Sequence, residues 1–98
     1  MAEEFKRDKS IARMAGNLKV LRNKLGLTQN DLAGKVGISR QTIVNIENNK
    51  REMSWNTFVA LIAVFRAESG TSDLLDYFGI YSPELSRYLV SRENICSG

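Results

Sequence analysis

The segment from residue 29 to residue 48 constrains the fold more than any other part of the chain, because its small and apolar residues follow a fixed spacing. Ala33 supplies a small side chain where two short helices can cross closely. Gly37 accepts the positive φ that a tight turn between them requires. The apolar positions that would wedge this pair onto a core are Leu32, Val36, Ile38, Ile43 and Ile46. The spacing therefore predicts two short helices joined by a tight turn, a helix-turn-helix unit.

The flanking sequence also predicts helices. Ile11, Met14, Leu18, Leu21 and Leu25 recur at steps of three and four, which is typical of one face of a helix that begins after Ser10 and ends at Gly26. The residues expected to cap the following helices are Thr28 (with Asp31 three positions on), Ser39 and Ser54. The helix over 55–67 is apolar almost all round, so we expect it at the centre of the core.

Three further segments complete the prediction. Residues 68–72 are polar and predict a loop, a short helix follows up to Gly79, and Pro83 begins a last helix that ends at about Arg92. With a single proline and frequent Leu, Ile, Ala, Lys and Arg, the chain is expected to be all-α, with five or six helices in one domain over residues 1–98. Residues 1–9 are expected to form a mobile arm, and the last few residues a frayed tail.

Charge is distributed unevenly. Residues 1–51 hold eleven Lys and Arg against five Asp and Glu, whereas residues 52–98 hold three against six. A basic first half and an acidic second half indicate that the first half faces a polyanion. The alternative is an ordinary pattern of solvated charges.

Several function classes find no support in the sequence. The chain has no histidine and one cysteine, Cys96, so it lacks zinc-ligand spacings and a nucleophile with a histidine base, and it shows no Gly-rich phosphate loop. We expect no enzyme activity, no metal and no cofactor. The longest apolar run, 58–65, is too short for a membrane span, and charges within residues 3–9 leave no signal peptide. Because Cys96 is the only cysteine, no internal disulfide is possible, and a cytoplasmic location is expected.

The stretch TQNDLAGKVGISRQTIVNIENNK, preceded by LKVLRNKLGL, resembles the phage-repressor-type (Xre, Cro/repressor-like) helix-turn-helix domains. The resemblance covers about Met14 to Phe78 and implies a compact lambda-repressor-like domain over 10–80. Such domains are mostly transcriptional repressors that bind palindromic operators on double-stranded DNA as homodimers. Gly34, inside the second helix, and Asn49, where a glycine is usual, depart from the family pattern; asparagine is the next-best residue for a left-handed position.

The resemblance also implies roles for individual residues. The expected base-reading residues on the third helix are Arg40, Gln41, Thr42, Val44 and Asn45, because arginine suits guanine and Gln or Asn suits adenine. The residues expected to hold the DNA backbone are Thr28, Gln29, Ser39, Asn48, Asn49, Lys50 and Arg51. Arg22 and Glu47 match positions that commonly form a partly buried ion pair.

For each of these groups there is a plainer alternative. The polar residues of the third helix and the charges at positions 50 and 51 could be merely solvated, and Val44 is either a thymine-methyl contact or a scattered surface residue. Trp55 and Tyr77 are expected in the core rather than as base-stacking platforms.

The second half of the chain is the candidate for protein contacts. Residues 81–98 lie beyond the family's minimal domain, and the stripe expected to form the dimer is Tyr81, Leu85, Tyr88 and Leu89. Deleting residues 83–98 would then leave a folded monomer. Two alternatives remain open. One is an antitoxin-type protein that binds DNA and also neutralises a protein partner through its C-terminal third; the other is a domain that uses the fold only for protein contacts.

Overall fold

A computed structural model describes the backbone of residues 6–97 and the side chains of residues 6–90. Within this part the chain forms six helices and no strand. Their bounds are α1 Arg7–Lys24, α2 Gln29–Val36, α3 Arg40–Glu47, α4 Trp55–Arg66, α5 Ser69–Tyr77 and α6 Pro83–Ser97. The predicted all-α class and the helix-turn-helix at the second and third helices are confirmed.

Local capping explains where four of these helices begin. Thr28 and Asp31 form a reciprocal capping box at α2, with both hydrogen bonds at 3.0 Å. Ser39 and Ser54 each accept a hydrogen bond from the backbone N–H three residues on, and Ser82 does the same for α6. Each cap satisfies a backbone donor that the helix itself cannot pair, so the predicted starts of α2, α3, α4 and α6 are confirmed.

Two predicted helix boundaries, one near each end of the chain, are wrong. The first helix begins at Arg7, and Ser10 is a buried residue inside it, not its cap. Part of the expected mobile arm is therefore helical, and residues 1–5 lie outside the described part of the chain. The last helix continues to Ser97 instead of ending near Arg92.

The polar segment 68–72 is helical rather than a loop, because α5 already begins at Ser69. Thr71 is fully buried there, and its hydroxyl donates to the carbonyl oxygen of Phe65 at the end of α4. Burying a hydroxyl group costs free energy unless the group is hydrogen-bonded, and the bond to Phe65 offsets that cost for Thr71. This contact fastens α5 directly to α4.

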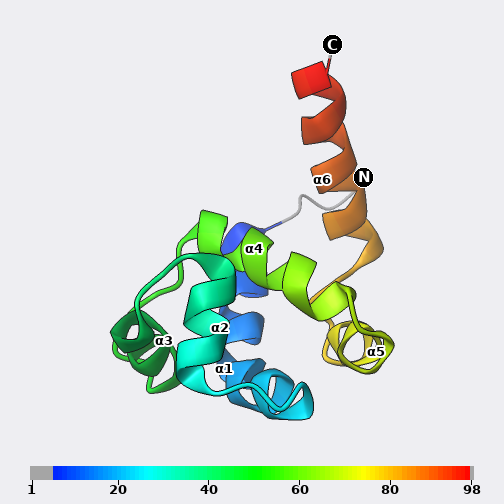
Figure 1. The fold of residues 1–98 in the computed structure, drawn as a ribbon. Helices are drawn as coiled ribbons and strands as arrows, with labels where there is room; N and C mark the ends of the chain where they lie inside the picture. Colours follow the sequence, from blue (N-terminus) through cyan, green and yellow to red (C-terminus); the bar gives the residue numbers. More distant parts are fainter. Residues whose placement is uncertain (1–5, 98) are drawn as a thin grey trace.

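The core is built around α4, as its apolar sequence predicts. Phe58, Leu61 and Phe65 of α4 are completely buried. The other fully buried apolar side chains come from every remaining helix and from the α5–α6 turn: Met14, Leu18, Leu21, Leu32, Ile43, Ile46, Leu75, Ile80 and Leu85. In Figure 1, α3 and α5 lie on opposite sides of this core, and α6 extends away from it.

Leu85 belongs to this core, which contradicts its expected place in a dimer interface. Its side chain is 0% exposed within the single chain. The rest of the expected stripe is also engaged: Leu89 packs against the core, and the Arg66 guanidinium lies 4.0 Å from the centre of the Tyr81 ring. The stripe after Pro83 therefore serves mainly to attach α6 to its own domain.

Candidate nucleic-acid interface

The turn between α2 and α3 fixes the angle at which the two helices meet. Gly37 has φ 78° and ψ 31°, a left-handed conformation that side-chain-bearing residues rarely adopt. The N–H groups of Gly37 and Ile38 both donate to the carbonyl oxygen of Ala33, at 2.9 and 3.1 Å. Ala33 is almost fully buried, so its small side chain permits the close crossing that the sequence predicts.

The far end of α3 uses a second left-handed residue. Asn49 has φ 61°, the only positive φ outside glycine in the described chain. The N–H of Lys50 then donates to the carbonyl of Asn45 at 2.8 Å, which satisfies a helix-end acceptor. Asparagine thus takes the place of the usual glycine, and it leaves Asn48, Asn49, Lys50 and Arg51 exposed beyond α3.

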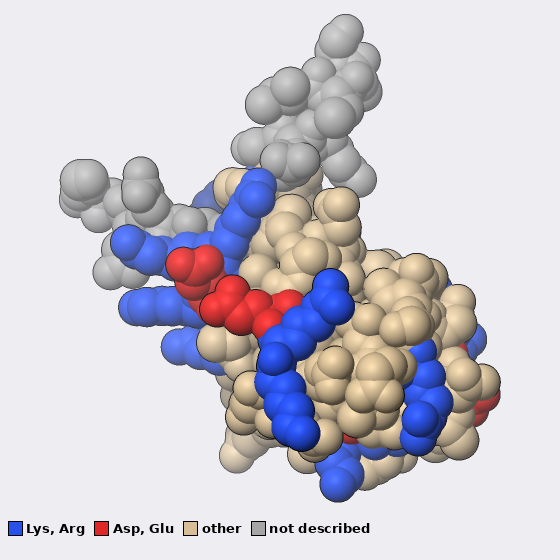
Figure 2. Space-filling model, turned by 90° about the vertical axis from the view of Figure 1, so that its left-hand side faces the viewer, with Lys and Arg blue, Asp and Glu red and all other residues tan. Residues whose placement is uncertain are grey.

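The outward side of α3 collects the expected base-reading residues. Arg40 and Gln41 are exposed, and Thr42, Val44 and Asn45 are partly exposed. The Gln41 side-chain N–H donates to the Asn45 side-chain oxygen at 3.1 Å, so these two amides form a linked pair one helical turn apart. Figure 2 views the molecule from the α3 side, and shows Lys and Arg side chains around a largely uncharged surface, with one acidic cluster between them at the upper left and a further acidic group at the right-hand edge.

Most polar groups at the start of α2 and α3 are already hydrogen-bonded within the protein. Both capping atoms of Thr28 pair with Asp31, and the Ser39 hydroxyl contacts the backbone N–H and the hydroxyl of Thr42. Gln29 is partly buried and donates to Glu47 at 3.0 Å. Sequence patterns did not indicate this last contact, because nothing local relates positions 29 and 47.

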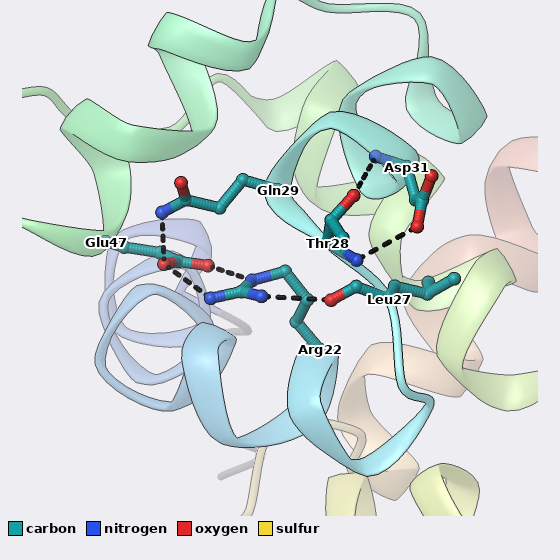
Figure 3. A network of polar contacts seen from close by, with 6 residues as sticks. All are labelled: Arg22, Leu27, Thr28, Gln29, Asp31 and Glu47. Carbon is teal, nitrogen blue, oxygen red and sulfur yellow. Dashed lines mark hydrogen bonds and ion pairs between the residues drawn. The ribbon is translucent and has the colours of Figure 1, made fainter.

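Arg22 and Glu47 form the ion pair that the resemblance implies. The Arg22 Nε lies 2.7 Å from Glu47 Oε2, and a second guanidinium nitrogen lies 3.2 Å from Oε1. The remaining nitrogen donates to the carbonyl of Leu27 at 2.9 Å. Figure 3 shows how this guanidinium, on α1, connects the turn before α2 with the carboxylate on α3. The side chains are only 10% and 4% exposed, so this is a buried, two-pronged pair.

The Glu47 carboxylate remains charged despite its position. Burial by itself would raise the pKa of Glu47, but hydrogen bonds from Arg22 and Gln29, together with the positive charge of Arg22, outweigh burial and hold that pKa below its usual range. The pair therefore has its full strength at neutral pH, where it fixes both Gln29 and α3 relative to α1.

Two aromatic residues behave differently from one another. Trp55 is partly buried and stacks on Phe58 at 5.0 Å, as a core residue should. Tyr77 was also expected in the core, and this expectation is wrong, because 84% of its surface is exposed. It lies at the last position of α5, where the apolar contacts are supplied by Leu74, Leu75 and Phe78 instead.

A contact between the two ends of the described chain was not visible in the sequence. The Arg7 guanidinium lies 4.6 Å from the Trp55 ring centre and donates to the Tyr88 hydroxyl at 2.7 and 3.0 Å. Tyr88 also meets Trp55 edge-on at 5.8 Å. Tyr88 is thus part of a contact that joins α1, α4 and α6, and this explains its position better than the expected dimer interface does.

Features of some other protein classes are missing from the part of the chain that the structure describes. No helix there combines the length and the apolar character needed to cross a bilayer. Among the same residues, no three His, Cys, Asp or Glu side chains form a group that could hold a metal ion.

The geometry agrees with comparisons with known proteins. The helix-turn-helix family profile matches residues 18–70, more than half of the chain. The chain therefore belongs to the helix-turn-helix family of DNA-binding regulators. No solved structure gives a significant match.

Individual relatives fall into two groups. Antitoxin HipB of Escherichia coli O6:H1 is 38% identical over 58 residues, which cover 59% of this chain and 62% of the antitoxin. Antitoxin HipB of E. coli K12 is 36% identical over 58 residues, or 66% of its length. An uncharacterised HTH-type transcriptional regulator of Methanocaldococcus jannaschii is 51% identical over 41 residues, which cover 42% of this chain and 62% of that protein. The chain thus spans a little under two-thirds of the antitoxins it matches.

Proposed function

We propose that this protein is a sequence-specific transcriptional regulator that places α3 in the major groove of double-stranded DNA. The observation that carries the proposal is the outward side of α3. The Arg40 guanidinium is exposed there beside the linked side-chain amides of Gln41 and Asn45. Major-groove edges of base pairs present the acceptors and donors that these groups complement. The family profile and the HTH-type regulators among the relatives support the same class.

The proposed contacts are of two kinds: contacts that read base edges and contacts that hold the DNA backbone. Arg40 suits the paired acceptors of guanine, while Gln41 and Asn45 suit adenine; Thr42 and Val44 border them, and the Val44 methyl groups suit a thymine methyl. Lys50 and Arg51, with Asn48 and Asn49, are exposed beyond α3 and would contact phosphates. At the start of α2, Gln29 and Thr28 would approach a phosphate on the other side of the groove, and Ser39 would do so beside α3.

Repression through a palindromic operator is the form of regulation that we propose. A single short helix covers only a few base pairs, which is too little information to select one site in a genome. Two copies related by a two-fold axis would read two half-sites about one helical turn apart. Blocking a promoter by occupying it is the simplest mode of action for such a pair.

Selection of bound sequences from a random duplex pool tests this proposal. We expect an enriched inverted repeat whose half-sites are separated by about 10 base pairs. A variant carrying Arg40→Ala, Gln41→Ala and Asn45→Ala is the control, and it should enrich no sequence. The assignment of α3 as the base-reading helix would be contradicted if the unchanged protein enriched no sequence, or if the control variant enriched the same repeat.

An antitoxin role is the second candidate, and the similarity to the two HipB antitoxins favours it. In that case the chain would bind DNA and also neutralise a protein partner. Expressing the neighbouring genes one at a time separates the alternatives. A neighbouring gene that stops growth when expressed by itself, but not when expressed together with this chain, would establish the antitoxin role. If no neighbouring gene stops growth, only the regulator proposal remains.

A further inference from the structure

Two amide side chains on the outward side of α3 are bonded to each other. The Gln41 side-chain N–H donates to the side-chain oxygen of Asn45 at 3.1 Å. Because the two residues are four positions apart, they lie one above the other on the same face of the helix. Gln41 is exposed, whereas Asn45 is partly buried. The hydrogen bond therefore ties a side chain in solvent to one that lies closer to the body of the protein.

Asn45 is the more firmly held member of this pair. Its backbone carbonyl accepts from the N–H of Lys50 at 2.8 Å, across the left-handed Asn49. The next residue, Ile46, is buried in the core. Gln41 has the longer side chain, and a glutamine loses much rotamer freedom when it is immobilised. A bond to Asn45 removes part of that freedom before DNA binds, so less of it is lost on binding.

The hydrogen bond also decides which atoms each amide offers to DNA. Gln41 keeps its oxygen as an acceptor and one N–H as a donor, and these are the groups that pair with N6 and N7 of adenine. Asn45 turns its oxygen toward Gln41, so its free donors are on the nitrogen, on the other side of the amide carbon. Donors suit the acceptors of guanine (O6 and N7) or thymine (O4), but not the N6 donor of adenine.

We infer that Gln41 and Asn45 read DNA as one unit. Asn45 is a positioning residue that holds the Gln41 amide for adenine, and its own amide nitrogen donates to a guanine or thymine. Four residues advance a helix by about 6 Å, so this second base lies one or two base pairs from the adenine. The inference rests on the proposed function and narrows it, because Asn45 no longer reads adenine itself.

Variants at position 45, compared by selection from a random duplex pool, test the inference. Gln41→Ala first locates the base pair that Gln41 reads, as the pair at which the preference for adenine disappears. Asn45→Leu has a similar size but neither accepts nor donates. We expect it to reduce the preference for adenine at that same base pair about tenfold, in addition to relaxing the second position.

The conservative variant separates the two roles of Asn45. Asn45→Asp still accepts from Gln41 but has no N–H to donate, so it should keep the preference for adenine and lose only the preference for guanine or thymine. The matched control is Asn56→Leu, the same change at an exposed amide on α4, which should alter neither position. The inference would be overturned if Asn45→Leu kept the full preference for adenine, or if Asn45→Asp lost as much of it as Asn45→Leu.

A double variant measures the coupling between the two amides. If Asn45 acts partly through Gln41, Asn45→Leu should cost more affinity for the best site in the unchanged chain than in a chain that already carries Gln41→Ala. Equal losses in both backgrounds would show that the two side chains read DNA independently, against the inference.

A measurement without DNA separates this inference from the proposed function. The ¹⁵N order parameter of the Gln41 side-chain amide should fall in Asn45→Leu and remain unchanged in Asn45→Asp. Equal order parameters in all three proteins, in a chain that selects an operator, would overturn the inference and leave the proposed function standing. A chain that selects no sequence would contradict the proposed function, and with it the reading roles, even if the Gln41 amide proved ordered.

Discussion

The Arg22 guanidinium donates to Glu47 on α3 and to the Leu27 carbonyl before α2, so one side chain on α1 fixes the relative position of three segments. Glu47 in turn accepts from Gln29 at the start of α2. The two residues that position the candidate DNA-binding surface are therefore not on that surface. Their contribution is to hold α2 and α3 at a set angle to α1.

Replacing Arg22 with alanine should reduce the free energy of unfolding by about 3–5 kcal/mol, because it leaves the Glu47 charge buried without its partner. Urea unfolding of Arg22→Ala measures this loss. Lys9→Ala is the control: Lys9 is exposed on the same helix, and its removal should change stability by less than about 0.5 kcal/mol. Equal stabilities for the two variants would show that the ion pair contributes nothing.

The Glu47 pair should also make stability depend on acid pH. The folded protein lowers the pKa of Glu47, so its stabilising effect is complete above the unfolded pKa, about 4.3, and is lost as the pH falls through the lower folded value. Glu47→Gln removes the charge but keeps the shape. We expect it to be less stable than the unchanged protein at pH 7 and to approach it below pH about 4. A stability difference that stays constant with pH would contradict the lowered pKa.

Whole helices show which local signals were sufficient. The caps at Thr28, Ser39 and Ser54 act on backbone groups three residues away, and all three starts agree with the sequence. The start of α5 does not agree with the sequence. No side chain caps this helix, and the Thr71 hydroxyl in its first turn instead donates to the carbonyl oxygen of Phe65 on α4. Helix boundaries set by neighbours in space are invisible to a local pattern.

The two proposed classes of DNA contact around α3 predict different mutational effects. Arg40→Ala should cost about 1–3 kcal/mol on the best operator and relax the preference at one or two base pairs, since it removes a base-edge contact. Lys50→Ala should weaken all duplexes alike and reduce the salt dependence of binding, since it removes a phosphate contact. Competition titrations with operator and mixed-sequence DNA distinguish these outcomes. Identical profiles for the two variants would mean that α3 does not read bases.

At the scale of the whole molecule, α6 is part of the domain. Ile80 and Leu85 are completely buried, and Tyr88 is held by Arg7 from the other end of the described chain. The contacts join segments about 80 residues apart in sequence. Although α6 lies beyond the residues that the family profile matches, its buried residues are part of the core of this domain.

Removing the buried side chain of α6 should therefore destabilise the single chain. Leu85→Ala is expected to lower the free energy of unfolding by about 2–5 kcal/mol, because it leaves a cavity in the core. Deletion of residues 83–98 should lower it further, in contrast to the expectation that a folded monomer would remain. Thermal unfolding followed by circular dichroism measures both effects. A truncated chain as stable as the full one would show that α6 is dispensable.

The sequence by itself determined the helical class, the helix-turn-helix spacing and most helix starts. Ala33, Gly37 and the capping residues act through the backbone within one turn, so their effect is the same wherever the segment sits in the fold. The positions of Arg40, Gln41 and Asn45 on one side of α3 follow from the helical period alone. The family resemblance added the Arg22–Glu47 pair, which no local pattern contains.

Only the tertiary structure decided which faces are covered. Leu85 and Tyr77 are both apolar or aromatic residues near the end of the chain, yet one is completely buried and the other is 84% exposed. Periodicity says which residues share a face, but burial depends on what another helix places opposite that face. The bond from Gln29 to Glu47 and the contact of Arg7 with Tyr88 depend on the same packing, because each joins residues that only the folded core brings together.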